Sequence, residues 1–441
     1  MKRLQVEQLK DPVDSSMMVG AFRATDGVID AVPFFNAPLG CPFHILLMWS
    51  RHNRNTLNPY QSMIQQDDVI MGMDGKLELS LRKTLDDLSQ SKKALLIISS
   101  DAAEIISPNT EEIARKLMEK RKNSVQIIPL QSAGLKGNHV DGFNEVLLKL
   151  LERFAKTPEK RIPYSVNLLG IVQDEITTRG DVAEVRRMLE GIGIQTLGTF
   201  LLDTDTDQIS RASETSLNLA LHEEYGLEAA QYLEKTYGMP YLCIFPPFGF
   251  EGTKEWLLEV ADYFGRAEEA QRFVEGEERR IYPRIVQADQ YLTGRRMAVY
   301  ADPTMATGIT RLAAEMGMTP VLTGFSVENE GCFKRLLEIN ERYELSPQVL
   351  QDDNINFKFL ARDLRPHVIF GTGLHYELSV EVGAYLYSIN YPTSQRLRVF
   401  DIPIMGYQGL LYTVQQIGDE MLRQDLFDET VHGARHVDEE A

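Results

Sequence analysis

Short apolar runs alternate along the chain with longer stretches in which apolar residues recur at helical spacing. The runs of strand length cover 93–100, 125–129, 165–170, 194–200, 296–301, 319–323 and 367–371. Helices are expected between them, at 109–121, 141–154, 181–191, 227–237 and 303–316. In the helix expected over 141–154, for example, Phe143, Val146 and Leu150 share one face. Strands that alternate with helices predict parallel sheets with helices on both faces.

Three such units follow one another, which predicts an α/β protein with three Rossmann-like domains. A charged linker, 156–161, marks the first boundary. The expected order is an N-terminal extension (1–18), a first domain (19–157), a second domain (158–265), a linking helix (266–292), a third domain (293–425) and an acidic tail (426–441). Pro283 lies inside the linking helix and should kink or break it.

Ligands of open parallel sheets bind outside the carboxyl ends of the strands. The loops expected there are 99–107, 170–178, 301–307 and 371–375. No G-x-G-x-x-G fingerprint opens a helix after a strand, and no G-x-x-x-x-G-K-[ST] sequence occurs, so nucleotide binding has no support. Asp181 is expected to cap the helix that it begins, and Tyr385 and Tyr387 to belong to a strand with one packed face.

Composition narrows the class of protein. The 441 residues include 64 acidic and 46 basic side chains, a net charge of −18, which argues against a nucleic-acid partner. No apolar run approaches the ~20 residues of a membrane span. The N-terminus has no apolar segment typical of a secretory signal. Three widely spaced cysteines make no disulfide framework, so a cytoplasmic setting is expected.

One of these cysteines follows an apolar run on a glycine-flanked turn. Val32–Phe35 leads into Pro38-Leu39-Gly40-Cys41. Gly40 permits a sharp turn and removes a side chain that would crowd whatever meets the sulfur. A thiolate at a loop tip is a good ligand for an iron–sulfur cluster. The alternative is a buried, unreactive thiol.

Several further stretches occur in a specific order along the chain. They are Val19–Phe22, Val32–Phe35, Gly40–Cys41, Arg51–Arg54, Asp67–Leu77, Ile98–Ile106, Ala133–Asn138, Pro246–Thr253, Tyr291–Arg296, Ala301–Pro303 and Gly406–Gly409. In this order the chain resembles the nitrogenase component 1 superfamily over about 19–421. Pro246–Thr253 is similar to the corresponding segment of β-type subunits, so the resemblance is to the β-like half of a pair.

The resemblance implies a metal site with a departure from the family pattern. Catalytic subunits hold an eight-iron cluster with three cysteines each, whereas here only Cys41 is kept. The second position falls near 58–61, which has no cysteine, and the third is occupied by Asp101. One thiolate suffices for a [4Fe-4S] cluster only if a partner supplies three more. Asp101 is expected as a weaker ligand, or else as a cap of the following turn. Gly40 and Ser100 are the adjoining candidate contacts.

Other candidate residues have simpler alternatives. His222 falls near the position of the cofactor cysteine of catalytic α subunits, but a solvent-facing histidine at a helix start is expected. His375 is expected as a polar residue of the cleft. Asp67 and Glu104 are candidate general acids or surface carboxylates. The pair Met71 and Met73 is expected to serve in packing.

The function implied is that of a β-like subunit of a nitrogenase-like oxidoreductase. It would pair with an α-like subunit, in a heterotetramer with two copies of each, and receive electrons from an iron protein that hydrolyses MgATP. A larger metal cofactor would belong to the partner. The alternatives are a non-enzymatic scaffold for cofactor assembly and a tetrapyrrole reductase, including a homodimer with two Cys41 and two Asp101 at one cluster. The substrate and the catalytic residues stay undefined.

Overall fold

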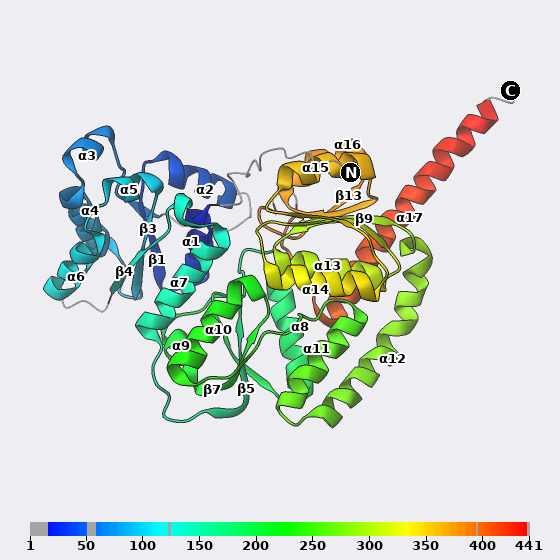
Figure 1. The fold of residues 1–441 in the computed structure, drawn as a ribbon, viewed down its shortest axis with the longest axis horizontal. Helices are drawn as coiled ribbons and strands as arrows, with labels where there is room; N and C mark the ends of the chain where they lie inside the picture. Colours follow the sequence, from blue (N-terminus) through cyan, green and yellow to red (C-terminus); the bar gives the residue numbers. More distant parts are fainter. Residues whose placement is uncertain (1–15, 51–58, 122–124, 394–395, 439–441) are drawn as a thin grey trace.

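Three parallel sheets with helices packed between and around them form the molecule (Figure 1). The computed structural model describes residues 16–50, 59–121, 125–393 and 396–438. The segment 51–54, which carries part of the family resemblance, lies outside these residues. The three parallel sheets confirm the predicted α/β fold. The strands of the three sheets fall within 31–130, 162–242 and 296–388, while the domain boundaries stay a prediction.

The first sheet carries, in the described residues, four parallel strands in the spatial order β2-β1-β3-β4. These are β2 (Tyr60–Gln61), β1 (Ala31–Asn36), β3 (Ala94–Ser99) and β4 (Gln126–Leu130). Every residue of β1 and β3 is buried, as expected for parallel strands covered on both faces. The helices are α1 (Met17–Asp26), α2 (Gly40–Ser50), α3 (Gln66–Met71), α4 (Asp74–Asp87), α5 (Asp101–Ile106), α6 (Thr110–Arg121) and α7 (His139–Phe154), with a 3-10 turn η1 (Gly134–Lys136).

The second sheet has the order β6-β5-β7-β8, with all neighbours parallel. Its strands are β5 (Ile162–Leu169), β6 (Gln195–Thr199), β7 (Thr215–Ala220) and β8 (Tyr241–Leu242). Its helical segments are α8 (Thr178–Gly191), α9 (Thr206–Ser210), η2 (Ala212–Glu214), α10 (Glu223–Tyr237) and α11 (Phe250–Tyr263). One apolar core joins α1, β1, β3 and α7 to α10, so the first two sheets share packed side chains.

The third sheet has the order β11-β10-β9-β12-β13. Its strands are β9 (Arg296–Ala301), β10 (Thr319–Phe325), β11 (Gln348–Gln351), β12 (Val368–Gly371) and β13 (Tyr385–Ser388). Its helical segments are α13 (Pro303–Glu315), α14 (Glu330–Arg342), α15 (Asn354–Leu364), η3 (Gly373–His375) and α16 (Tyr376–Val382). As predicted, Tyr387 of β13 is buried, and Tyr385 is partly covered.

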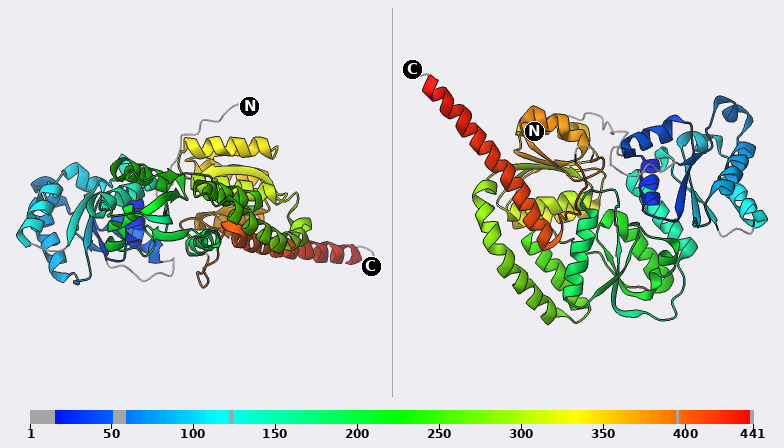
Figure 2. Two further views of the ribbon diagram at one scale, coloured as in Figure 1. Left: turned by 90° about the horizontal axis from the view of Figure 1, so that it is seen from below. Right: turned by 180° about the vertical axis from the view of Figure 1, so that it is seen from behind.

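Two long helices frame the second and third sheets. α12 (Ala267–Leu292) runs along one side of the molecule, and α17 (Gly406–Asp438) packs on it before projecting away from the body (Figures 1 and 2). Pro283 was predicted to kink or break the linking helix; the break is wrong, because α12 continues through it, while the kink stays a prediction. The lost backbone hydrogen bond is offset by packing, since Val274 and Ile281 are fully buried against neighbouring helices.

Candidate functional site

The carboxyl edge of the first sheet brings Cys41 and Asp101 together. Cys41 lies in the first turn of α2, just after β1, and Asp101 is the first residue of α5, just after β3. β1 and β3 are adjacent and in register from Ala31↔Ala94 to Asn36↔Ser99. The expected loop-tip position of Cys41 is therefore corrected, because the cysteine lies in the first turn of a helix.

Polar side chains fix the backbone at this edge. Asn36, the last residue of β1, accepts a hydrogen bond from Ser62 Oγ at its Oδ1 (2.8 Å), and its carbonyl accepts from Ser100 N (3.1 Å). The Ser100 hydroxyl caps α5 by accepting from Ala103 N (3.4 Å). Ser100 therefore has a structural role here. The amide Nδ2 of Asn36 is buried and has no hydrogen-bond partner among the described residues.

The carboxylate of Asp101 points to the turn that follows β4. Its Oδ1 accepts a hydrogen bond from Leu135 N (2.8 Å). A Cβ added to Gly134 would lie 3.3 Å from its Oδ2, so the turn approaches the carboxylate closely. Asp101 therefore accepts a hydrogen bond from a neighbouring turn. The alternative expectation, that Asp101 caps the turn that follows it, is wrong, because Ser100 caps α5.

The thiol of Cys41 is half-buried and packs against the core between the first two sheets. Burial raises its pKa, and the negative charge of Asp101 raises it further. A Cβ added to Gly40 would meet no atom within 4 Å. The glycine therefore borders open space, and no contact within the chain requires its missing side chain.

Large apolar side chains surround this edge and face solvent. They come from the segments that follow all four strands: Leu39, Phe43, Leu47, Met63, Val69, Ile70, Met71, Ile105 and Leu135. Leu135 is 85% exposed and Met71 84% exposed. The expectation that Met71 and Met73 serve in packing holds for the buried Met73 and is wrong for Met71. Large exposed apolar side chains gathered on the segments that follow one sheet edge are typical of an interaction site.

Few metal ligands gather at this edge. Among the residues that the structure describes, no three His, Cys, Asp or Glu side chains form a group able to hold a metal ion. The edge fits an iron–sulfur cluster only as one part of a shared site, with Cys41 as the thiolate donor. Asp67 is exposed, and Glu104 is partly exposed and paired with Lys136 at 2.7 Å, so neither lies in a shielded pocket suited to a general acid.

Both candidate histidines lie inside the protein. The expectation of a solvent-facing His222 is wrong: it is buried at the start of α10, and burial lowers its pKa to about 4. His375 is fully buried rather than in a cleft, with Nε2 2.8 Å from Asn354 Oδ1 and Nδ1 accepting from Thr372 N. Burial lowers the pKa of His375 to about 3. Both imidazoles are therefore neutral structural groups.

A buried polar network ties the three sheets together near His222. Arg23 pairs with Asp174 at 2.8 Å, and Asp302 contacts His139 Nε2 at 3.2 Å. Tyr225 also donates to Asp302 (2.8 Å). The cavity at this junction has a volume of about 10 Å³, which is room for about one water molecule. The described side chains therefore leave no space for a substrate there.

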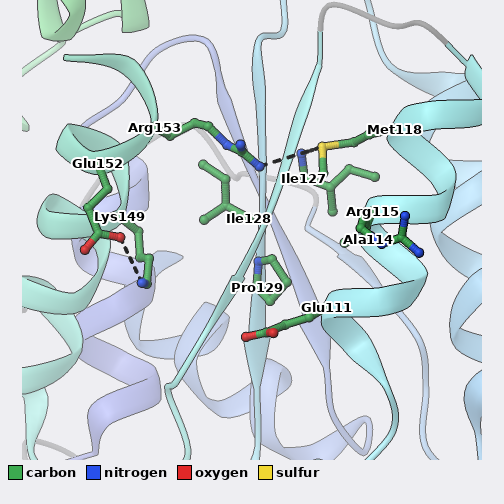
Figure 3. Close-up of a pocket in the computed structure, with 10 residues that line it drawn as sticks. All are labelled: Glu111, Ala114, Arg115, Met118, Ile127, Ile128, Pro129, Lys149, Glu152 and Arg153. Carbon is green, nitrogen blue, oxygen red and sulfur yellow. Dashed lines mark hydrogen bonds and ion pairs between the residues drawn. The ribbon is translucent and has the colours of Figure 1, made fainter. Parts of the chain in front are cut away.

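A larger groove lies elsewhere on the first sheet (Figure 3). It has a volume of about 490 Å³ and runs between α6 and α7 along the outer edge of β4. The edge offers few donors, because Pro129 has no N–H and Ile127 N donates to Met118 Sδ (3.4 Å). None of Gly40, Cys41, Ser100 or Asp101 lines it.

The other two cysteines have structural surroundings. Cys332 is buried with Sγ 3.4 Å from Thr304 Oγ1. Cys243 is partly covered, and burial raises its pKa to about 11. The resemblance assigned Cys41 and Asp101 to one metal site, and both residues lie at the carboxyl edge of the first sheet. The sequence analysis missed Asn36 and the exposed apolar side chains. The run Val69-Ile70-Met71 between polar residues was the available signal for those apolar side chains.

No helix in the described part of the chain is long and apolar enough to cross a membrane.

Known proteins share this architecture. A solved structure titled "Nitrogenase Cp1 at pH 6.5" superimposes with a TM-score of 0.85 over 96% of this chain and 95% of that chain, at 16% identity. The nitrogenase molybdenum-iron protein beta chain of Methanococcus maripaludis is 24% identical over 93% of this chain and 94% of its own length. A light-independent protochlorophyllide reductase subunit of Bradyrhizobium sp. (strain ORS 278) is 26% identical over 89% of this chain and 76% of its own. The family model for nitrogenase component 1 type oxidoreductases matches residues 16–422. The chain therefore belongs to the nitrogenase component 1 type oxidoreductase family.

Proposed function

We propose that this chain is the β-like subunit of a nitrogenase-like oxidoreductase, in which Cys41 supplies one thiolate to a [4Fe-4S] cluster shared with an α-like partner. The observation that carries the proposal is the position of Cys41. Its half-buried thiol lies at the start of α2, near Asp101, at a sheet edge whose following segments expose large apolar side chains. A thiol without further thiol ligands at such an edge suits a site that a second chain completes.

The ligand count supports a shared cluster. Because no described group of three potential ligands lies in this chain, three of the four iron atoms would take their protein ligands from the partner. When bound, such a cluster transfers single electrons, here from a MgATP-dependent iron protein toward the substrate. Asp101 is the candidate for a weaker, exchangeable carboxylate ligand in place of one of these four, although Leu135 N already binds one of its oxygens.

Each residue around Cys41 has a definable task in this site. Cys41 must lose its proton to bind iron, and because its pKa is raised, iron binding releases that proton. Leu135 N orients Asp101, and Ser100 holds the start of α5 on Asn36. Gly40 leaves the approach to the sulfur open. The exposed apolar side chains at this edge would exclude water once the partner covers them, which lowers the dielectric around the cluster.

Substrate reduction is assigned to the partner or to the space between the chains. The junction of the three sheets holds only about 10 Å³ of free volume, so its described side chains leave no room there for a substrate or a larger metal cofactor. We place any larger cofactor in the partner for the same reason. The assembly proposed is a heterotetramer of two α-like and two β-like chains.

A second candidate function is a scaffold on which a metal cofactor is built. The nitrogenase iron-molybdenum cofactor biosynthesis protein of Methanosarcina barkeri is 27% identical over 69% of this chain and 68% of its own length. A single cysteine suits a scaffold equally well. A tetrapyrrole reductase is the third candidate, supported by the similarity to the protochlorophyllide reductase chain and by the carboxylate at position 101.

The experiment is anaerobic reduction of the complex by the iron protein. The chain is co-purified with its α-like partner and mixed with reduced iron protein, with and without MgATP. MgATP-dependent electron uptake followed by release of a reduced product supports the enzyme. Uptake with no product from dinitrogen, tetrapyrroles or sulfur compounds, together with transfer of a metal cofactor to an acceptor protein, supports the scaffold. No uptake in any condition contradicts an electron relay.

A further inference from the structure

Three polar atoms at the junction of the three sheets have no hydrogen-bond partner among the described residues. They are Arg23 Nη2, His139 Nδ1 and Asn390 Oδ1. Their residues are 4%, 2% and 3% exposed, so bulk solvent does not hydrate these atoms. All three residues line the same cavity of about 10 Å³. Because a buried polar atom is costly to leave unpaired, three of them at one cavity point to a ligand.

The imidazole of His139 has one of its two nitrogens engaged. Its Nε2 lies 3.2 Å from Asp302 Oδ1. Asp302 also accepts hydrogen bonds from Tyr225 (2.8 Å) and Ser326, as an ionised carboxylate does. Nε2 therefore carries the hydrogen that points to Asp302. In the neutral ring this leaves Nδ1 as an acceptor.

The roles of the other two atoms follow from the contacts of their own side chains. Asn390 Nδ2 donates to Glu175 Oε1 (3.3 Å), so Oδ1 of the same amide is an acceptor. Arg23 Nε donates to Asp174 (2.8 Å), and Nη2 of the same guanidinium can only donate. The three unpaired atoms are therefore one donor and two acceptors.

Water matches this set in size and in hydrogen bonding. Its oxygen accepts from Arg23, while its two hydrogens donate to His139 and Asn390. The cavity has room for about one molecule of that size. A cation would meet the guanidinium of Arg23, and an anion would meet the acceptor oxygen of Asn390. Water also fits a protonated His139, because its oxygen can accept a second hydrogen bond.

We propose that the junction binds one water molecule as a structural ligand, held by Arg23 Nη2, His139 Nδ1 and Asn390 Oδ1. The inference goes beyond the proposed function, because it involves neither the cluster nor the partner. Arg23 belongs to α1, His139 begins α7 and Asn390 follows β13, so the water joins helices of the first sheet to the third sheet. It completes a hydrogen-bonded chain from Glu175 through Asn390 and His139 to Asp302.

A crystal structure of the full chain at atomic resolution tests the site directly. The expected result is one density peak at hydrogen-bond distance, about 2.7–3.2 Å, from all three atoms. Crystals grown with bromide in place of chloride should show no anomalous peak there. An empty cavity, an anomalous peak at the site, or a molecule that contacts fewer than three of the atoms overturns the proposal.

Two variants separate the water contact from a general disturbance of the core. Asn390→Leu keeps nearly the same volume and removes the acceptor, so the water peak should be lost. The matched control is Asn144→Leu, because Asn144 is also buried and has an unpaired Oδ1, yet it does not line the cavity. The water peak should persist in this control. A peak retained in Asn390→Leu, or lost in both variants, contradicts the assignment.

Neutron diffraction from wild-type crystals in D₂O gives a test that needs no variant. One deuterium of the bound water should point to Asn390 Oδ1 and none to Arg23 Nη2. The reverse orientation would overturn the proposed set of donors and acceptors.

Discussion

Cys41 and Asp101 lie close enough, at the carboxyl ends of adjacent strands, for the charge of Asp101 to add to burial in raising the pKa of the Cys41 thiol. The isolated chain therefore keeps this thiol protonated near neutral pH. A metal that binds the sulfur must displace the proton, so cluster assembly at Cys41 weakens as the pH falls.

Replacing Asp101 by Asn should make Cys41 more reactive. Asn can still accept the hydrogen bond from Leu135 N, but it carries no charge, so the pKa of the thiol falls. The rate of Cys41 alkylation by iodoacetamide, measured by peptide mapping from pH 6 to 10, should reach its midpoint at lower pH in Asp101→Asn. Glu104→Gln is the control. An unchanged midpoint in Asp101→Asn would show that the two groups do not interact.

The hydrogen bond between Ser62 and Asn36 should contribute to stability. Both side chains are buried, and Asn36 Nδ2 already has no partner among the described residues. Ser62→Ala leaves Asn36 Oδ1 unpaired as well, which should lower the free energy of unfolding by about 1–3 kcal/mol. Urea denaturation is the measurement. Ser89→Ala, at an exposed position, should change it by less than about 0.5 kcal/mol.

Breaking the ion pair of Arg23 and Asp174 should be costly. Both side chains are buried, and the pair joins α1 to the loop after β5. Arg23→Met leaves the carboxylate of Asp174 in the interior and should cost about 3–5 kcal/mol of unfolding free energy. Arg82→Met, which breaks an exposed pair with Glu78 on one helix, should cost less than about 1 kcal/mol. Equal effects of the two substitutions would argue against a buried network.

Glu224 should make stability depend on pH. Burial raises its pKa to about 8, and nearby Asp302 adds to the effect. The folded state therefore binds a proton that the unfolded state releases near its ordinary pKa, about 4.5. The contribution of Glu224 to stability is fully present below pH 4.5 and is lost as the pH rises to about 8.

Glu224→Gln removes this proton exchange. Its free energy of unfolding should rise relative to the wild type between about pH 4.5 and pH 8, and the difference should level off above that range. Urea denaturation at several pH values gives the comparison, with the exposed Glu234→Gln on the same helix as control. Parallel pH profiles for wild type and Glu224→Gln would contradict a raised pKa.

The sequence allowed much of the fold to be predicted, because burial on both faces leaves continuous apolar runs. β3 is such a run, and the position of Asp101 after it placed the carboxylate beside Cys41. Parallel strands bring their carboxyl ends to one edge. The resemblance assigned Cys41 and Asp101 to one metal site, but local periodicity does not show that β1 and β3 are neighbours.

Contacts between distant segments could not be predicted in the same way. His222 looks like a polar helix start, but it is buried, and the backbone N of the next residue, Glu223, donates to Thr304 Oγ1 of α13 (3.1 Å). Asp181 does not cap its own helix, which begins earlier, at Thr178. It accepts hydrogen bonds from the amides of Ile404 (2.7 Å) and Met405 (2.8 Å). Local periodicity carries no information on such pairings.

The most direct test of the central claim is the iron content and the reduced-state electron paramagnetic resonance spectrum of the anaerobic complex with the α-like partner. The wild type should hold about four irons per pair of chains. Cys41→Ala should lose or alter the cluster signal, while Cys243→Ala should keep it. An iron-free wild-type complex, or a Cys41→Ala complex with the wild-type iron content and spectrum, would contradict the assignment of Cys41 as a cluster ligand.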